Sequence, residues 1–177
     1  MKHLPIFLFI FLIIPIAFAE EAKPSARADI INTNGEGVGA ALFYPSGEGV
    51  KIKIEITNLP LVAGEHGFHI HNIGSCEPPD FKSAGPHFNP TGKKHGLEVP
   101  EGHHAGDLSN ILLGPDGKVK MEVIENKDVS LQENVSNSLF HEGGTSLVIH
   151  ENADDYKTDP AGNAGTRVAC GVIKKVE

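Results

Sequence analysis

The chain has 177 residues and a formal net charge of −8, from 15 basic and 23 acidic residues. A chain of this length forms about one domain, and 40% hydrophobic with 21% charged residues is typical of a globular protein rather than a disordered one. No block rich in Lys or Arg occurs, so the composition argues against nucleic-acid binding.

The first nineteen residues have the pattern of a secretory signal peptide. A polar start leads into an apolar run over residues 4–18, and residues 17–19 form an A-x-A cleavage site. The run is short for a membrane-spanning helix and contains Pro5 and Pro15. We therefore predict a signal peptide over 1–19 and an exported domain over 20–177; the alternative is a retained membrane anchor. Loss of Lys2 with the signal changes the net charge from −8 to −8 − 1 = −9.

Eight short strands follow along the mature chain. Twenty Gly and twelve Pro predict many turns, and no stretch is long enough for a helix of more than about two turns. The sequence Gly114-Pro115-Asp116-Gly117 predicts a hairpin turn. This pattern indicates an all-β fold, an antiparallel sandwich or barrel. The predicted strands cover residues 28–33, 38–44, 50–57, 66–71, 107–113, 118–124, 146–150 and 168–176.

Two polar segments interrupt the strands, over residues 72–104 and 151–167. The first is rich in Pro and Gly and is too long for an ordinary connection. It is either disordered or ordered by something other than a hydrophobic core. Cys76 in this segment and Cys170 in the last strand are the two cysteines of the chain. In an exported protein one intrachain disulfide is the default, worth about 4–5 kcal/mol for so long a loop, and two free thiols are the alternative.

The ten histidines of the chain are concentrated around these segments. His69 and His71 are two residues apart on a predicted strand, so their side chains share one face, roughly 7 Å apart. His87, His95 and His104 lie in or at the end of the first long segment. Asp107 and His150 complete the set. We predict that His66, His103 and His141 are surface residues.

Imidazole and carboxylate groups in this number indicate a metal site. Imidazole suits zinc and copper, and a lone carboxylate fits zinc well. A bound metal would also order the first long segment, because ligation offsets part of its conformational entropy. For any single histidine a structural role is the more common one, but six histidines and one aspartate in these places favour metal binding.

Six stretches of the sequence also match a known family in order and in spacing. Together they resemble the copper/zinc superoxide dismutases of the exported bacterial type, over nearly the whole mature chain. The stretches are 67–71 (GFHIH), 85–90 (GPHFNP), 95–96 (HG), 103–108 (HHAGDL), 148–155 (VIHENADD) and 162–173 (GNAGTRVACGVI).

The resemblance implies a fold and a set of site residues. The fold is an eight-stranded antiparallel Greek-key sandwich or barrel, immunoglobulin-like, with two long functional loops. Asp154 resembles the carboxylate that links a copper ligand to a zinc ligand, here His69 and His95. The cysteines resemble the family disulfide, and Arg167 resembles the arginine that attracts the anion. The implied copper ligands are His69, His71, His87 and His150, and the implied zinc ligands are His87, His95, His104 and Asp107.

The implied activity is an oxidoreductase reaction, the dismutation of superoxide to molecular oxygen and hydrogen peroxide. A redox-cycling copper next to a structural zinc would perform it, with His87 bridging the two metals and acting with Arg167 in catalysis. The role would be antioxidant defence outside the cytoplasm, in the periplasm. The partner is the superoxide anion, with no nucleic acid and no membrane once the signal is removed. The chain would be a monomer or a homodimer.

Two other functions stay open at this stage. A metal-binding or copper-buffering protein could use the same fold, and loss of a copper ligand would favour it. A purely structural zinc domain would not need His69, His71 and His150. A superoxide dismutase must also attract an anion to a protein of net charge −9, so a local positive channel has to outweigh the overall charge. Arg167 suits this task, and Lys157 is a second candidate.

Overall fold

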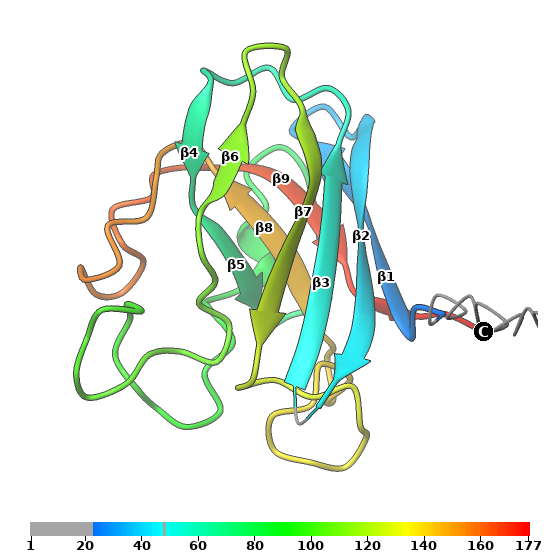
Figure 1. The fold of residues 1–177 in the computed structure, drawn as a ribbon, viewed down its shortest axis with the longest axis vertical. Helices are drawn as coiled ribbons and strands as arrows, with labels where there is room; N and C mark the ends of the chain where they lie inside the picture. Colours follow the sequence, from blue (N-terminus) through cyan, green and yellow to red (C-terminus); the bar gives the residue numbers. More distant parts are fainter. Residues whose placement is uncertain (1–22, 48) are drawn as a thin grey trace, which may run out of the picture.

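The computed structural model describes residues 23–177 apart from Glu48, so the predicted signal peptide lies outside the described residues. Within that part of the chain the secondary structure is β, with one short 3-10 helix, η1 (Lys82–Ala84). None of the described helices is long and apolar enough to cross a membrane. The strands, shown in Figure 1, are β1 (Ala26–Asn32), β2 (Gly37–Ser46), β3 (Gly49–Ile56), β4 (Gly64–His66), β5 (Phe68–His71), β6 (Ile111–Leu113), β7 (Val119–Asn126), β8 (Ser146–His150), β9 (Arg167–Val172) and β10 (Lys174–Lys175).

The strands pair antiparallel into one large curled sheet and one small one. The large sheet has the order β5-β8-β9-β1-β2-β3-β7, and β10 adds to β1. The small sheet pairs β4 with β6. Because β4 leads into the edge strand β5 and β6 leads into the edge strand β7, the small sheet joins both edges at one end of the molecule (Figure 1). The predicted all-β antiparallel fold is confirmed.

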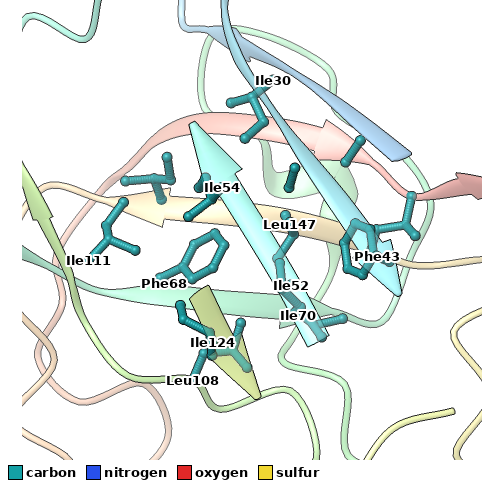
Figure 2. Close-up of a cluster of buried hydrophobic side chains, with 14 of the residues drawn as sticks. Ile30, Phe43, Ile52, Ile54, Phe68, Ile70, Leu108, Ile111, Ile124 and Leu147 are labelled. Carbon is teal, nitrogen blue, oxygen red and sulfur yellow. The ribbon is translucent and has the colours of Figure 1, made fainter. Parts of the chain in front are cut away.

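The core fills the inside of this curled sheet. Alternate residues of β1 and β3 are buried, as expected for strands with one wet face. Phe43, Ile52 and Phe68 are fully buried and point into the same interior from three strands (Figure 2). The apolar alternation of the sequence therefore fixes which face of each strand is covered.

Three strand predictions and one hairpin prediction were wrong in detail. The predicted strand 168–176 is interrupted at Ile173, between β9 and β10. The predicted strand 66–71 is divided at Gly67, whose N–H donates to Asn152 O (2.8 Å) and whose carbonyl accepts from His150 N (2.8 Å). The predicted strand 107–113 is reduced to β6, because Asn110 N donates to the hydroxyl of Tyr156 (2.7 Å) instead of to a strand. The turn at 114–117 forms, but the two strands it joins, β6 and β7, lie in different sheets.

Candidate metal centre

The two histidines of β5 lie side by side on the face turned away from the core. Phe68 and Ile70 point into the core, and His69 and His71 alternate with them, all four being buried. The ring centroids of His69 and His71 are 6.4 Å apart. The predicted placement of both rings on one face of a strand is confirmed.

The first long segment is ordered because it pairs with the free edge of β5. Ile70 N donates to Gly106 O (2.8 Å), and Ile70 O accepts from Phe88 N (2.9 Å). A Cβ on Gly106 would lie 2.2 Å from Ile70 O, so only glycine allows this close approach. The pairing brings His87 opposite His71 and Asp107 opposite His69.

The predicted disulfide fixes the start of the same segment. Cys76 is bonded to Cys170 of β9, with their Cα atoms 5.6 Å apart and 94 positions apart in the sequence. No free cysteine occurs in the described chain. The segment is therefore tied to the sheet at both ends, by the disulfide and by the pairing with β5.

A first group of four buried histidines converges between β5, β8 and the long segment. Their ligand atoms all lie within 4.8 Å of one another. Each ring has one buried nitrogen without a hydrogen-bond partner in the protein. The four unpartnered atoms are His69 Nδ1, His71 Nε2, His87 Nε2 and His150 Nε2.

The opposite nitrogens of three of these rings are held by the protein. His71 Nδ1 donates to Gly85 O at 2.9 Å, and His150 Nδ1 donates to Gly165 O at 3.2 Å. His69 Nε2 lies 2.6 Å from an oxygen of Asp154. Such contacts fix the tautomer and leave the free nitrogen as a lone-pair donor, which is the usual support of a metal-binding histidine.

Burial keeps these rings neutral. It lowers the pKa of His150 to about 3 and that of His87 to about 4, with repulsion from the neighbouring His69 acting in the same direction. Burial also places the pKa of His71 well below its usual value. A histidine must be neutral to bind a metal, so the group is in its ligand form at neutral pH.

A second group of four residues adjoins the first. The Nδ1 atoms of His87, His95 and His104 lie 2.9, 3.0 and 3.2 Å from Asp107 Oδ1. Asp107 Oδ2 accepts from the backbone N–H groups of Gly96 (2.9 Å) and His104 (3.1 Å). Three imidazoles and one carboxylate are a zinc donor set.

The second group is electrostatically different from the first. Burial opposes ionisation of Asp107, but its hydrogen bonds with the three histidines outweigh this and lower its pKa far below the usual value. Burial likewise lowers the pKa of His95, and its hydrogen bonds with Asp107 and Asp154 outweigh that and raise it to about 9. A carboxylate that is ionised among histidines suits a cation of charge +2.

His87 belongs to both groups. Its Nδ1 faces Asp107 and the second group, and its Nε2 is the unpartnered nitrogen of the first. The ring centroids of His87 and His69 are 4.1 Å apart, and those of His87 and His95 are 5.2 Å apart. This is the placement of a ring that can bind two metals at once.

Asp154, from the segment between β8 and β9, connects the groups a second time. Its Oδ2 lies 2.6 Å from His69 Nε2, and its Oδ1 lies 3.0 Å from His95 Nε2. A Cβ on Gly162, which has φ +62°, would lie 1.8 Å from Asp154 Oδ1. The second long segment thus closes directly over this carboxylate.

Arg167, the first residue of β9, lies at the edge of the first group. Its Nη1 donates to Phe81 O (2.7 Å) and its Nη2 donates to Gly85 O (2.6 Å). The guanidinium is half-buried and held on both sides of η1. Lys157, the other candidate for attracting an anion, forms an exposed ion pair with Glu98 at 2.7 Å, which weakens its claim to this role.

The three histidines predicted at the surface differ from one another. The prediction was wrong for His66, which is 4% exposed, with its ring nitrogens 3.1 Å from His150 O and 2.9 Å from Val62 O. His103 is half-buried beside Asp128, and His141 is half-buried against the ring of Phe88. None of the three belongs to a candidate metal group within the described residues.

The sequence did not reveal Asn110 as part of the site. Its side-chain amide accepts from Asp154 N (2.9 Å) and donates to Asp154 O (3.0 Å), which fixes the backbone of the linking carboxylate. Asn110 follows Asp107 by three positions, and this proximity to the second group is the signal that could have indicated it.

The antiparallel β-scaffold holds one group of four histidines and a second group of three histidines and one aspartate, and the two groups share one histidine. This arrangement defines a protein with a two-metal centre. The sequence profile of the copper/zinc superoxide dismutase (SODC) family matches residues 38–173. The chain belongs to this family.

Individual relatives agree with the family profile. Cu-Zn superoxide dismutase 1 of Aquifex aeolicus (strain VF5) is 55% identical over 158 residues, which cover 89% of this chain and 91% of the relative. Superoxide dismutase-like protein YojM of Bacillus subtilis (strain 168) is 44% identical over 148 residues, covering 83% of this chain and 74% of the relative. The crystal structure of a SOD-like protein from Bacillus subtilis has a TM-score of 0.77 at 43% identity, covering 82% of this chain and 96% of that one.

As a member of this family, the protein is an oxidoreductase that dismutates superoxide to molecular oxygen and hydrogen peroxide, with copper and zinc as its metals. Both metals fit the donor atoms of this chain. Four neutral imidazole nitrogens without partners suit copper, and the set with a carboxylate suits zinc.

Proposed function

We propose that the first group holds the copper and the second group holds the zinc of this dismutase. The copper ligands are His69, His71, His87 and His150, and the zinc ligands are His87, His95, His104 and Asp107. One observation carries the proposal: each ring of the first group has a buried nitrogen without a partner. An unpaired buried polar atom costs free energy, so four of them in one place point to a metal that binds all four.

The balanced reaction converts two superoxide anions and two protons into one O₂ and one H₂O₂. Copper supplies the redox chemistry when bound, taking an electron from one superoxide and giving it to the next. The protein has to attract the anion, orient it and provide protons. Arg167 offers a positive charge that two hydrogen bonds fix beside the first group, and we assign it the attraction of the anion.

His87 is suited to handle one of the protons. Its Nδ1 is held by Asp107, so Nε2 is the nitrogen that can carry a proton toward the first group. We therefore assign His87 a role as bridging ligand and proton donor.

The zinc has no redox chemistry, so its part is structural. It would hold His87 in place and order the first long segment. Asp154 would fix the position of the two metal sites relative to each other, because its carboxylate contacts His69 of the first group and His95 of the second. The disulfide and the signal pattern of residues 1–19 support export to the periplasm, where this enzyme would remove superoxide formed outside the cytoplasm.

Metal analysis of the purified mature protein, together with a superoxide-decay assay, tests this function. We expect one copper and one zinc per chain and fast decay that is lost on copper removal. A protein that binds copper without accelerating decay would be a copper-buffering protein instead. Zinc uptake with no copper would identify a structural zinc domain and overturn the assignment of the first group.

A further inference from the structure

The zinc-group residue His95 is held by three carboxylates, one at each of its nitrogen atoms. Its ring nitrogens contact Asp107 (Nδ1, 3.0 Å) and Asp154 (Nε2, 3.0 Å). Its backbone N–H donates to Oδ1 of Asp159 at 2.8 Å. Two of the three carboxylates, those of Asp154 and Asp159, come from the second long segment.

Asp159 is held in position by a compact turn within that segment. The carboxylate of Asp155 accepts from the backbone N–H groups of Lys157 (2.9 Å) and Thr158 (2.8 Å). Gly162 N donates to Thr158 O at 2.6 Å, and Asp155 N donates to Gly162 O at 2.9 Å. These hydrogen bonds close residues 155–162 into a unit that presents Asp159 to the zinc group.

The two segments also meet next to this contact through their backbones. Glu98 N donates to Tyr156 O at 3.2 Å. A Cβ on Gly96, which has φ +116°, would lie 2.2 Å from the same carbonyl oxygen. The backbone around His95 is thus in direct contact with this turn. Asp159 is the residue of the turn whose side chain accepts from the backbone N–H of His95, the proposed zinc ligand.

We propose that Asp159 is a positioning residue for zinc, which acts by holding the backbone of His95. This rests on the zinc site proposed above. Asp107 and Asp154 orient the ring, whereas Asp159 fixes the Cα from which the ring projects. Removing a residue that hydrogen-bonds a metal ligand typically changes the metal affinity by about 10–100-fold. Asp159 makes such a hydrogen bond, to the backbone of His95, which lies in a segment without regular structure.

Two substitutions separate the hydrogen bond from the charge. Asp159→Ala removes the acceptor, and Asp159→Asn keeps an oxygen that can accept from His95 N while removing the charge. Glu142→Ala is the control, because it removes an exposed carboxylate that belongs to neither metal group. Zinc affinity is measured by competition with a chromogenic chelator, and the absorption spectrum of cobalt(II) bound in place of zinc reports the ligand geometry.

We expect Asp159→Ala to bind zinc at least about tenfold more weakly than the wild type and to change the cobalt spectrum. Asp159→Asn and Glu142→Ala should stay within about threefold of the wild type. Amide hydrogen exchange over residues 93–98 should be faster in Asp159→Ala alone, in the metal-free protein as well, which detects the lost contact independently of metal binding.

The outcomes distinguish this inference from the proposed function. A wild-type protein that takes up no zinc or cobalt would overturn the zinc site, and the role of Asp159 with it. Normal uptake by the wild type with unchanged affinity in Asp159→Ala would overturn the role of Asp159 alone. An Asp159→Asn variant as weak as Asp159→Ala would also overturn it, because charge rather than the hydrogen bond would then act.

Discussion

His71 and Arg167 donate hydrogen bonds to the same backbone oxygen, that of Gly85. His71 Nδ1 lies 2.9 Å from this carbonyl oxygen, and Arg167 Nη2 lies 2.6 Å from it. Gly85 has φ +73°, and a Cβ there would lie 2.9 Å from the side chain of Ile73, so only glycine fits. The shared acceptor, together with Phe81 O, therefore sets the position of the positive charge relative to the first group.

The first prediction concerns His150, which belongs to the first group only and is therefore a proposed ligand of copper alone. In His150→Ala, three copper ligands and the whole zinc group remain. We expect dismutase activity to fall by at least about 100-fold, since removal of a direct ligand exceeds the effect of losing an outer contact. Zinc content should stay at the wild-type value, and the melting temperature should fall by only a few degrees.

His103→Ala is the control for this experiment, because His103 is a half-buried histidine outside both groups. It should keep the wild-type rate and both metals. A His150→Ala protein that retained most of its rate at full copper loading would show that the copper assignment is wrong.

The second prediction concerns Asp107, the carboxylate of the zinc group. Asp107→Ala removes an acceptor that contacts three histidine rings and two backbone N–H groups. We expect zinc to be lost and the melting temperature to fall by roughly 5–10 °C, in keeping with the loss of a few kcal/mol. Limited proteolysis should cut within residues 72–106 earlier than in the wild type.

Asp128→Ala provides the comparison, since Asp128 is an exposed aspartate that contacts His103 and belongs to neither metal group within the described residues. It should leave zinc content and the protease pattern unchanged. Full zinc content and an unaltered melting curve in Asp107→Ala would rule out the zinc site described here.

The sequence predicted those features of the fold and site that depend on residues close together in the chain. Alternation over residues 50–57 indicated a strand with one wet face, and β3 has it. The spacing of His69 and His71 indicated a shared face, because a strand repeats every two residues. The concentration of His87, His95, His104, Asp107 and His150 around the long segments indicated the other members, and the family resemblance supplied only their division into two sites. The fold brings all seven residues together.

The parts that the sequence did not reveal are contacts between distant segments. His66 looked like a surface histidine, but it is buried between two carbonyl oxygens, one of them 84 positions away. The partners of His71 and His150 are carbonyl oxygens of Gly85 and Gly165, and every residue carries such a group. Nothing in a local pattern marks one carbonyl as the partner of a particular ring.

The third prediction concerns the pH dependence of the metal-free protein. The folded-state pKa values of His87 (about 4) and His150 (about 3) lie below the usual 6.5. The unfolded chain therefore binds more protons than the folded one below pH 6.5, and the free energy of unfolding falls as the pH drops from 6.5 toward 3. The pKa of His95 is raised to about 9, so its contribution is present below pH 6.5 and is lost as the pH rises through 9.

Urea unfolding of the metal-free protein at pH 4.5, 7 and 9.5 checks this dependence. Since a pKa difference of one corresponds to about 1.4 kcal/mol, we expect a loss of at least about 2 kcal/mol between pH 7 and pH 4.5. His150→Gln should reduce the loss on the acid side but leave the alkaline side unchanged. A urea midpoint that is the same at all three values would contradict the neutral burial of these rings.

The last prediction concerns Arg167 and the path of the anion. Superoxide has to reach a protein that is negative overall, so a local positive charge must dominate near the site. Lys157 is paired with Glu98 and Lys82 is paired with Asp80, both at 2.7 Å. Arg167 instead donates to two neutral carbonyl oxygens, and its charge is only partly offset by the nearby Asp80. Arg167 is therefore the cation that we expect to set the rate.

We expect Arg167→Glu to reduce the rate far more than Arg167→Lys does, by roughly tenfold or more, because steering by charge changes association rates by about 10–1000-fold. The wild-type rate should fall as salt rises, since charges are screened beyond about 10 Å at 0.1 M. In Arg167→Glu this slope should flatten or reverse, because salt would then screen a repulsion. Lys174→Glu, the same change of charge at an exposed residue of β10, should keep the wild-type slope. The measurement is superoxide decay against ionic strength at equal copper loading, and equal rates and slopes for wild type and Arg167→Glu would place the guidance of the anion elsewhere.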